Sequence, residues 1–202
     1  MKLYYLPGAC SMADHIALEW IGKPYEAEAV PRDQLKKEFV KINPNGSVPA
    51  LDVDGWILTQ NAAILNFLAD ENPESKLGGD GSAKSRAEIN RWLAFVNADV
   101  HPAFHPLFGS TAFLEDADAI EKTKDAARKK LRGLFEKANE QLAGREWLTG
   151  TRSIADPYLY VVSRWAKAMK LDLSGLEHLA AFNQRMDADT GVQKVIMAEG
   201  LN

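Results

Sequence analysis

The residue with the clearest capacity for chemistry is Cys10, the only cysteine among the 202 residues. It lies between a short apolar run, 2–6, and a helical pattern that begins at Ser11. A thiol at a helix start faces unpaired backbone N–H groups and the positive end of the helix dipole, and both favour the thiolate. Ser11 and Asp14 have the spacing of a capping box that would fix this helix start. Cys10 is therefore a candidate for sulfur chemistry, although a buried apolar role explains a lone cysteine equally well.

Two histidines form the second candidate group. His101 and His105 lie at the end of a long helical pattern, four residues apart, which is the spacing of a metal-binding pair on one helix face. Asp99 is the only carboxylate nearby, and Pro102 and Pro106 disturb the helix geometry. We therefore expect no metal here and treat the two side chains as imidazoles available for hydrogen bonding or proton transfer.

Alternating strand and helix patterns in the first part of the chain must position these residues. Short strands are expected at 2–6, 26–30, 51–53 and 56–58, of which 26–30 alternates polar and apolar residues, and helices are expected at 11–21 and 61–70. Asp54-Gly55 is a hairpin signal between the last two strands. The segment 31–41 is charged and is expected to be a loop with a short helix.

The rest of the chain is predicted to be helical. Pro73 and three glycines mark residues 71–81 as a break without periodicity. Helices are expected at 87–100, 119–142, 154–169, 176–186 and 192–197. The sequence thus predicts a mixed α/β domain over 1–74, a linker over 75–81 and an all-helical domain over 82–202.

Bulk composition restricts the partners. The net charge is −4, so general attraction to nucleic acid or anionic membranes is not expected. The chain has no signal-peptide pattern and no apolar run of membrane-spanning length. One cysteine excludes an intrachain disulfide and suits a reducing compartment. We expect a cytoplasmic protein with no nucleic-acid or membrane partner.

Four short motifs, in this order along the chain, resemble those of the bacterial beta-class glutathione S-transferases, the cysteine type. They are Pro7-Gly8-Ala9-Cys10-Ser11, Val48-Pro49 before a strand, Gln60-Asn61 at a helix start, and Ser153-Ile154-Ala155-Asp156-Pro157-Tyr158. The resemblance covers essentially the whole chain. It implies a thioredoxin-like N-terminal domain followed by an all-helical C-terminal domain. Each motif also has a structural explanation: an edge-strand proline, an ordinary helix cap and, for Ser153 and Asp156, a capping box that starts the central helix.

The resemblance also implies the roles of individual residues. The catalytic residues would be Cys10, His101 and Ser11, and His105 is the alternative candidate for the role of His101. A cis Val48–Pro49 bond would present the backbone to a peptide ligand. The glutathione-binding residues would be Cys10, Arg32, Lys36, Val48, Pro49, Gln60, Asn61, Asn97, His101 and His105. The hydrophobic substrate would contact Phe104, Phe108 and Trp165, and no metal would be bound.

The sequence departs from the family pattern at three of these positions. Asn61 replaces the usual serine or glycine, Ala94 replaces a polar residue with Asn97 nearby, and Arg32, Lys36 and Lys37 compete for the place of one lysine.

The implied function is conjugation of reduced glutathione, as co-substrate, to hydrophobic electrophiles, a detoxifying reaction of a bacterial homodimer. Cys10 would add glutathione-dependent thiol–disulfide exchange. A binding protein that sequesters hydrophobic compounds without turnover would need the same groove, so it remains the alternative.

Overall fold

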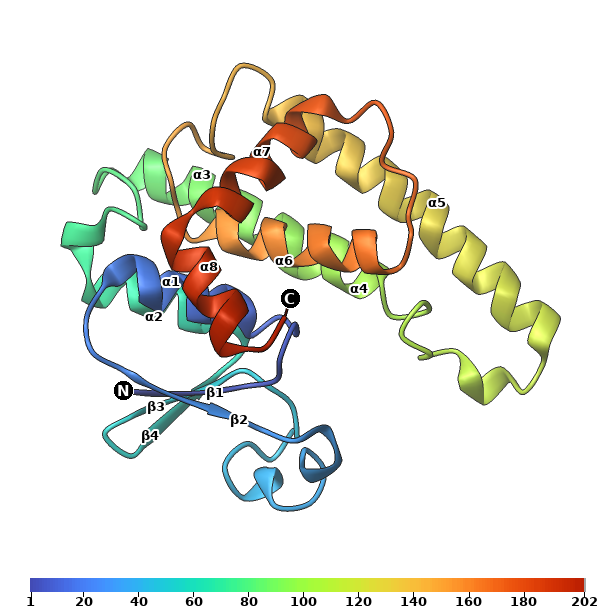
Figure 1. Cartoon of the computed structure of the whole chain (residues 1–202), viewed down its shortest axis with the longest axis horizontal. Coiled ribbons are helices and arrows are strands. Elements are labelled where there is room, and N and C mark those ends of the chain that lie inside the picture. Colours follow the sequence, from blue (N-terminus) through green and yellow to red (C-terminus); the bar gives the residue numbers. More distant parts are fainter. Residues whose placement is uncertain (202) are drawn as a thin grey trace.

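A four-stranded sheet forms the base of the N-terminal domain (Figure 1) in the computed structural model, which describes residues 1–201. The strands are β1 (Lys2–Tyr5), β2 (Glu26–Ala29), β3 (Ala50–Val53) and β4 (Trp56–Thr59), in the order β2-β1-β3-β4. β1 pairs with β2 in parallel, whereas β3 is antiparallel to both β1 and β4. The predicted strands and the hairpin at Asp54-Gly55 are confirmed, with one end of each strand shifted by one residue.

Two helices, α1 (Met12–Ile21) and α2 (Asn61–Glu71), pack on one face of this sheet. The buried side chains between the layers include Leu3, Met12, Leu51 and Ile64. The opposite face carries a smaller apolar cluster built from Tyr4, Val30, Phe39 and Ala50. Phe39 comes from the segment after β2, which holds the 3-10 turns η1 (Arg32–Gln34) and η2 (Phe39–Lys41). The predicted loop therefore covers the second face of the sheet instead of lying free.

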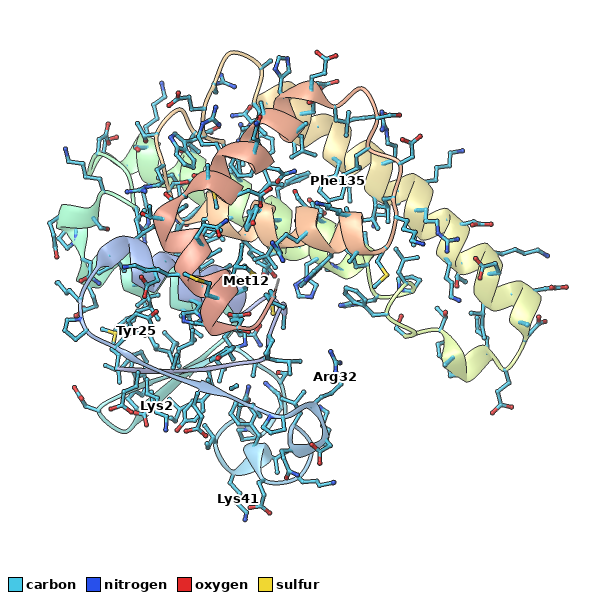
Figure 2. The ribbon with its side chains drawn as sticks, in the orientation of Figure 1. Lys2, Met12, Tyr25, Arg32, Lys41 and Phe135 are labelled. Carbon is cyan, nitrogen blue, oxygen red and sulfur yellow. The ribbon has the colours of Figure 1, made fainter. Side chains whose placement is uncertain are left out.

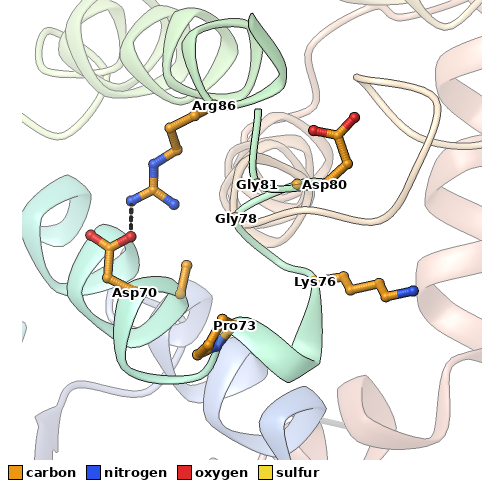
Figure 3. A pocket seen from close by; sticks show the side chains of 9 residues that line it. Asp70, Pro73, Lys76, Gly78, Asp80, Gly81 and Arg86 are labelled. Carbon is orange, nitrogen blue, oxygen red and sulfur yellow. Dashed lines mark ion pairs between the residues drawn. The ribbon is translucent and has the colours of Figure 1, made fainter. Parts of the chain in front are cut away.

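The linker between the domains is fixed to both of them. After the turn η3 (Pro73–Ser75), Leu77 is buried and its carbonyl accepts a hydrogen bond from Ile154 N–H at 3.0 Å. Arg86, which follows the linker, pairs with Asp70, which precedes it, at 2.7 Å, as Figure 3 shows. This ion pair borders an opening of about 510 Å³ beside the linker.

The helical domain contains α3 (Ala83–Ala94), the π-helical turn η4 (Phe95–Val100), α4 (His101–Ala103), the 3-10 turn η5 (Ala112–Leu114), α5 (Ala117–Gln141), α6 (Ala155–Ala168), α7 (Glu177–Ala188) and α8 (Thr190–Ala198). The first of these begins earlier than the predicted residue 87, because the Ser82 hydroxyl accepts a hydrogen bond from Ser85 N–H and caps it at that point. The predicted single helix to 100 is also interrupted, since residues 95–100 form a π turn. Such turns often lie at functional sites, and this one leads directly to His101.

The central helix α6 joins the two domains. Most of its side chains are buried, and it packs on α1 as well as on its own domain. Half of the predicted capping box at its start is formed, since the Asp156 carboxylate accepts from Ser153 N–H at 2.7 Å and also from Leu148 N–H at 2.9 Å. Ser153 Oγ accepts from Ala155 N–H at 3.3 Å instead of from Asp156 N–H. Within residues 1–201, no helix is both long enough and apolar enough to cross a bilayer.

The loop that carries Cys10 is held by the helical domain. Gly8 N–H donates to Glu199 Oε2 at 2.8 Å, and the Gly8 carbonyl accepts from Trp165 Nε1 at 2.7 Å. Leu201 packs against the open side of the same glycine, which has φ of +70°. Both backbone polar groups of Gly8 are therefore bonded to side chains far along the chain.

Candidate active site

A pocket of about 370 Å³ lies where the two domains meet, and we call it the interdomain pocket. It brings together residues from the Cys10 loop, the turn before β3, the start of α2, the π turn and α6. Its lining residues are Cys10, Asn43, Ser47, Val48, Pro49, Gln60, Asn61, Asn97, His101, Pro102, His105 and Tyr158. Most of the residues proposed from the sequence thus share one pocket. Asn43, Ser47, Pro102 and Tyr158 were missed.

One wall is the turn before β3. The Val48–Pro49 peptide bond is cis, as the resemblance implied. The Cys10 thiol donates a hydrogen bond to the Val48 carbonyl, with Sγ and O 3.7 Å apart. Asn43 stabilises the turn, because its Nδ2 donates to the Ser47 carbonyl at 2.6 Å. The backbone of Val48 and the thiol of Cys10 are therefore neighbours in the pocket.

The start of α2 forms the next wall. Gln60 has φ of +76°, a conformation that is strained for a residue with a side chain and that occurs mainly at functional sites. Asn61 Nδ2 donates to the Cys10 carbonyl at 3.1 Å, whereas its Oδ1 is buried without a partner among the described residues. Asparagine in place of the family's serine or glycine therefore ties the helix start to the cysteine loop.

The predicted capping box at Ser11 is not formed. Ser11 Oγ accepts from Leu6 N–H at 3.2 Å and lies 3.4 Å from the Leu6 carbonyl, to which it can donate. Ser11 is fully buried and does not line the pocket. Both carboxyl oxygens of Asp14 are buried without a hydrogen-bond partner in the part of the chain that the structure describes. Spacing alone did not reveal that both side chains turn into the core.

The expected preference of Cys10 for the thiolate is also contradicted. Burial, reinforced by the Asp14 carboxyl, raises the pKa of the Cys10 thiol to about 12. Hydrogen bonding from the N–H groups of Cys10 and Ser11 lowers it by less. The same burial, without a compensating partner, raises the pKa of Asp14 well above its usual value. Cys10 is therefore a neutral thiol at neutral pH in this structure.

The imidazole of His101 lies on the opposite wall. Its Nδ1 is 2.5 Å from the hydroxyl of Tyr158, which also lies 3.4 Å from Asn97 Oδ1. Burial, with a smaller contribution from His105, lowers the pKa of His101 to about 4. The ring is therefore neutral at physiological pH. Because Tyr158 donates its one hydroxyl hydrogen to Asn97 Oδ1, the same hydroxyl oxygen accepts from Nδ1–H of His101, which leaves Nε2 without a hydrogen.

The two candidate basic residues lie outside the pocket lining. Lys36 Nζ donates to the Asn45 carbonyl at 2.6 Å. Arg32 is exposed and extends from η1 toward the side of the molecule that holds the helical domain, as Figure 2 shows. Of these two, Arg32 is thus the better placed to reach a bound anion.

The proposed hydrophobic residues form an aromatic cluster beside His101. Trp165 packs edge-on against His101 and Phe108, with ring centroids 4.8 Å and 5.3 Å apart. Phe108 is 47% exposed, whereas Phe104 is fully buried beneath it. A ligand can contact the exposed edge of this cluster, but Phe104 supports it from below and does not offer a surface.

Residues 9–71 match the glutathione S-transferase N-terminal domain, and residues 88–189 match the glutathione S-transferase C-terminal domain. The chain is 55% identical to glutathione S-transferase GST-4.5 of Xanthomonas campestris pv. campestris and 41% identical to glutathione S-transferase GstA of Escherichia coli O157:H7. In both cases the match covers 100% of each chain.

Solved structures give the same result. A glutathione S-transferase from Xylella fastidiosa superposes with a TM-score of 0.97 at 52% identity, covering 100% of this chain and 99% of the other. A sphingomonad glutathione S-transferase complexed with glutathione gives 0.89 at 36% identity. A bacterial beta-class enzyme from Sphingomonas chungbukensis gives 0.89 at 34% identity, and both matches cover 100% of each chain.

Proposed function

This chain belongs to the glutathione S-transferase family, and on that premise we propose that it is a cysteine-type, beta-class enzyme whose active site is the interdomain pocket. Transfer to glutathione is the family's reaction, with glutathione as substrate. The observation that carries the finer assignment is the meeting of Cys10, Val48, Gln60 and His101 in one pocket. The similarity to a beta-class structure over the full length adds support.

Glutathione would lie against the turn before β3. The backbone of Val48 offers polar groups to an extended peptide, and such pairing is a common mode of peptide recognition. The α2 N-terminus, with Gln60 and Asn61, offers donors to the γ-glutamyl carboxylate. Asn97 and His105 line the far side, and Arg32 can approach from η1.

Cys10 and His101 would then act on the glutathione sulfur. A neutral Cys10 thiol can donate a hydrogen bond to the thiolate, and His101 Nε2, which carries no hydrogen, can accept a hydrogen bond from the glutathione thiol before it loses its proton. Donors that are already oriented in a partly buried site stabilise developing charge at little reorganisation cost. In this mechanism Cys10 never forms a covalent bond, and the electrophile binds against Phe108 and Trp165.

Thiol–disulfide exchange at Cys10 is the second candidate activity. The Cys10 thiolate would attack the glutathione sulfur of a mixed disulfide, which releases the other thiolate and forms a Cys10–glutathione disulfide. A glutathione thiolate would then attack this disulfide, releasing oxidised glutathione and restoring the Cys10 thiolate. Because the thiolate is the attacking form, a pKa of about 12 keeps the attacking fraction of Cys10 small at neutral pH.

Steady-state conjugation of 1-chloro-2,4-dinitrobenzene and reduction of a glutathione mixed disulfide, each measured for wild type and Cys10→Ala, test both activities. We expect conjugation to persist in Cys10→Ala while exchange disappears, because an alanine has no sulfur. Calorimetry with millimolar glutathione checks that both proteins bind it. Absence of binding by wild type would contradict the proposed site. Complete loss of both activities in a binding-competent Cys10→Ala would mean that Cys10 is essential to both, which would contradict the proposed division between them.

We also propose a homodimer in which each small domain packs on the partner's helical domain. Trp56 on β4 is 54% exposed and lies against Phe67, with ring centroids 5.5 Å apart. An apolar groove of about 650 Å³ between α3 and α5, near Trp92 and Leu134, offers a complementary surface. Sedimentation at micromolar concentration should give a dimer mass for wild type and a smaller mass for Trp56→Asp. A wild-type monomer would refute the assembly.

The single cysteine supports a cytoplasmic location.

A further inference from the structure

Asp14 is a buried carboxyl group that the proposed mechanism does not use. It lies in the first turn of α1, four residues after Cys10, and a helix brings positions four apart to the same face. Its side chain is fully buried, and neither oxygen has a hydrogen-bond partner among residues 1–201. An unpaired charge is costly to bury, and most buried carboxylates are therefore paired or hydrogen-bonded. Asp14 lacks the pairing that a structural carboxylate has.

Cys10 and Asp14 share one buried environment. Ala13 N–H donates to the Cys10 carbonyl at 3.0 Å, so the helical path of the backbone already includes Cys10. Burial, and after it the Asp14 carboxyl, are the main causes of the raised pKa of the Cys10 thiol. The pKa of Asp14 is itself raised by burial, and its own backbone N–H opposes this by less. The ionisation of each group therefore bears on that of the other.

The groups that face this pair from neighbouring elements do not neutralise it. The thiol donates to the Val48 carbonyl from the turn before β3, and Asn61 from α2 donates to the backbone beside it. From α6 comes Tyr158, and from the end of the π turn comes His101. Burial raises the pKa of Tyr158 and lowers the pKa of His101 to about 4, so both are neutral at physiological pH. No cation within residues 1–201 hydrogen bonds to the carboxyl.

Two like charges in a site without water repel each other strongly, so the thiol and the carboxyl do not readily ionise together. A carboxyl is intrinsically far more acidic than a thiol, and Asp14 therefore ionises first. We propose that Asp14 is a positioning residue whose charge holds Cys10 in its thiol form and thereby favours conjugation over thiol–disulfide exchange. This inference rests on the proposed function, in which the thiol acts as a donor in conjugation and the thiolate attacks in exchange.

The pH dependence of Cys10 reactivity tests the inference without any catalysis. Methyl methanethiosulfonate is a small reagent that transfers its methylthio group to a thiolate and releases methanesulfinate. Its rate is measured by intact mass between pH 5 and pH 9 for full-length wild type and for Asp14→Asn, which keeps the shape and removes the charge. Because the raised pKa of Asp14 keeps its carboxyl neutral in mild acid, we expect similar rates at pH 5 and a faster reaction of Asp14→Asn at pH 9.

The expected factor at pH 9 is about threefold. Loss of a neighbouring buried charge typically raises the thiolate fraction about tenfold, and the lower basicity of the new thiolate reduces its nucleophilicity about threefold. A loosened loop would instead change the rate by the same factor at every pH. Asp14→Leu has no hydrogen-bonding group, so it separates the loss of charge from the gain of an amide donor. It should show the same pH dependence, and it replaces Asp14→Asn if that variant does not fold.

Asp118→Asn is the matched control, because Asp118 also lies in the first turn of a helix, α5, but is exposed. It should react as wild type does at every pH.

The two activities test the consequence for the enzyme. Reduction of a glutathione mixed disulfide should be about threefold faster in Asp14→Asn than in wild type at pH 9, whereas conjugation of 1-chloro-2,4-dinitrobenzene should be unchanged, because Cys10 still holds its proton. Equal thiol reactivity of wild type and both variants at pH 9, a rate ratio that does not change with pH, or an unchanged ratio of exchange to conjugation would overturn the inference. A wild type with neither activity would contradict the proposed function, and the thiol reactivity would still decide whether Asp14 controls Cys10.

Discussion

The raised pKa of Cys10 predicts how its alkylation depends on pH. Iodoacetamide reacts with the thiolate, and with a pKa of about 12 roughly one thiol in 10⁵ is ionised at pH 7 and one in 10³ at pH 9. The rate of Cys10 alkylation should therefore rise about tenfold per pH unit from 7 to 10 without a plateau. An unhindered thiol would reach a plateau near pH 9, because its ordinary pKa is about 8.5.

Intact-mass spectrometry measures this reaction without ambiguity, since Cys10 is the only cysteine. Cys10→Ala is the control for reaction at other side chains. S-Methylglutathione, which cannot exchange disulfides, should slow alkylation of wild type, because it covers a residue that lines the interdomain pocket. A plateau between pH 6 and 8 would refute the reasoning, since it would mean that the helix start and its N–H groups outweigh burial.

The same pKa has a consequence for stability. The folded-state pKa lies above the unfolded one, so the contribution of Cys10 is fully present below about pH 8.5 and is lost as pH rises toward 12. Chemical denaturation of wild type and Cys10→Ala at pH 8 and pH 10 should show the steeper loss in wild type.

Three further predictions concern side chains around the pocket and the central helix. His101→Ala should lower the conjugation rate about a hundredfold, and His105→Ala should lower it less, because only His101 is oriented by Tyr158. A larger loss of kcat/KM in His105→Ala than in His101→Ala would exchange the roles of the two residues. Gln60→Gly should weaken glutathione binding in calorimetry. Its unfolding free energy should stay within about 1 kcal/mol of wild type, because glycine adopts φ of +76° without strain. Equal glutathione binding by the two proteins would remove Gln60 from the site. Asp156→Ala should lower the unfolding free energy by about 3 kcal/mol, because two buried N–H groups lose their acceptor. Asp116→Ala, at the exposed cap of α5, should lower it by only about 1 kcal/mol. Equal losses for the two variants in urea denaturation would contradict this.

The order of the helices and strands was predictable because turn residues and a helix-ending glycine in the sequence indicate where several of them end. Asp54-Gly55 allows the positive φ values of a tight hairpin, and Gly22 ends α1 in the left-handed conformation. The cis bond at Pro49 and the shared pocket of Cys10 and His101 followed from the family resemblance. Periodicity and composition alone would not have indicated them.

The errors have a common physical cause. Ser11 and Asp14 have the spacing of a cap, but tertiary packing turns both inward, and the same burial overrides the helix dipole at Cys10. Tyr158 was missed because an aromatic residue in an apolar helix is typical of the core. It is indeed almost fully buried, and only its hydroxyl reaches His101. Which atom of a buried side chain faces a pocket depends on the packing of several elements, and sequence spacing does not encode that.

Gly8 ties the assembly of the active site to the docking of the two domains. Its N–H is bonded to Glu199 and its carbonyl to Trp165, so the loop that presents Cys10 is braced by the last helix and the central one. An isolated thioredoxin-like domain would leave both groups to water and would free the loop to sample other conformations. The placement of Cys10 therefore depends on docking of the helical domain, because a chain that ends before α6 lacks both Trp165 and Glu199.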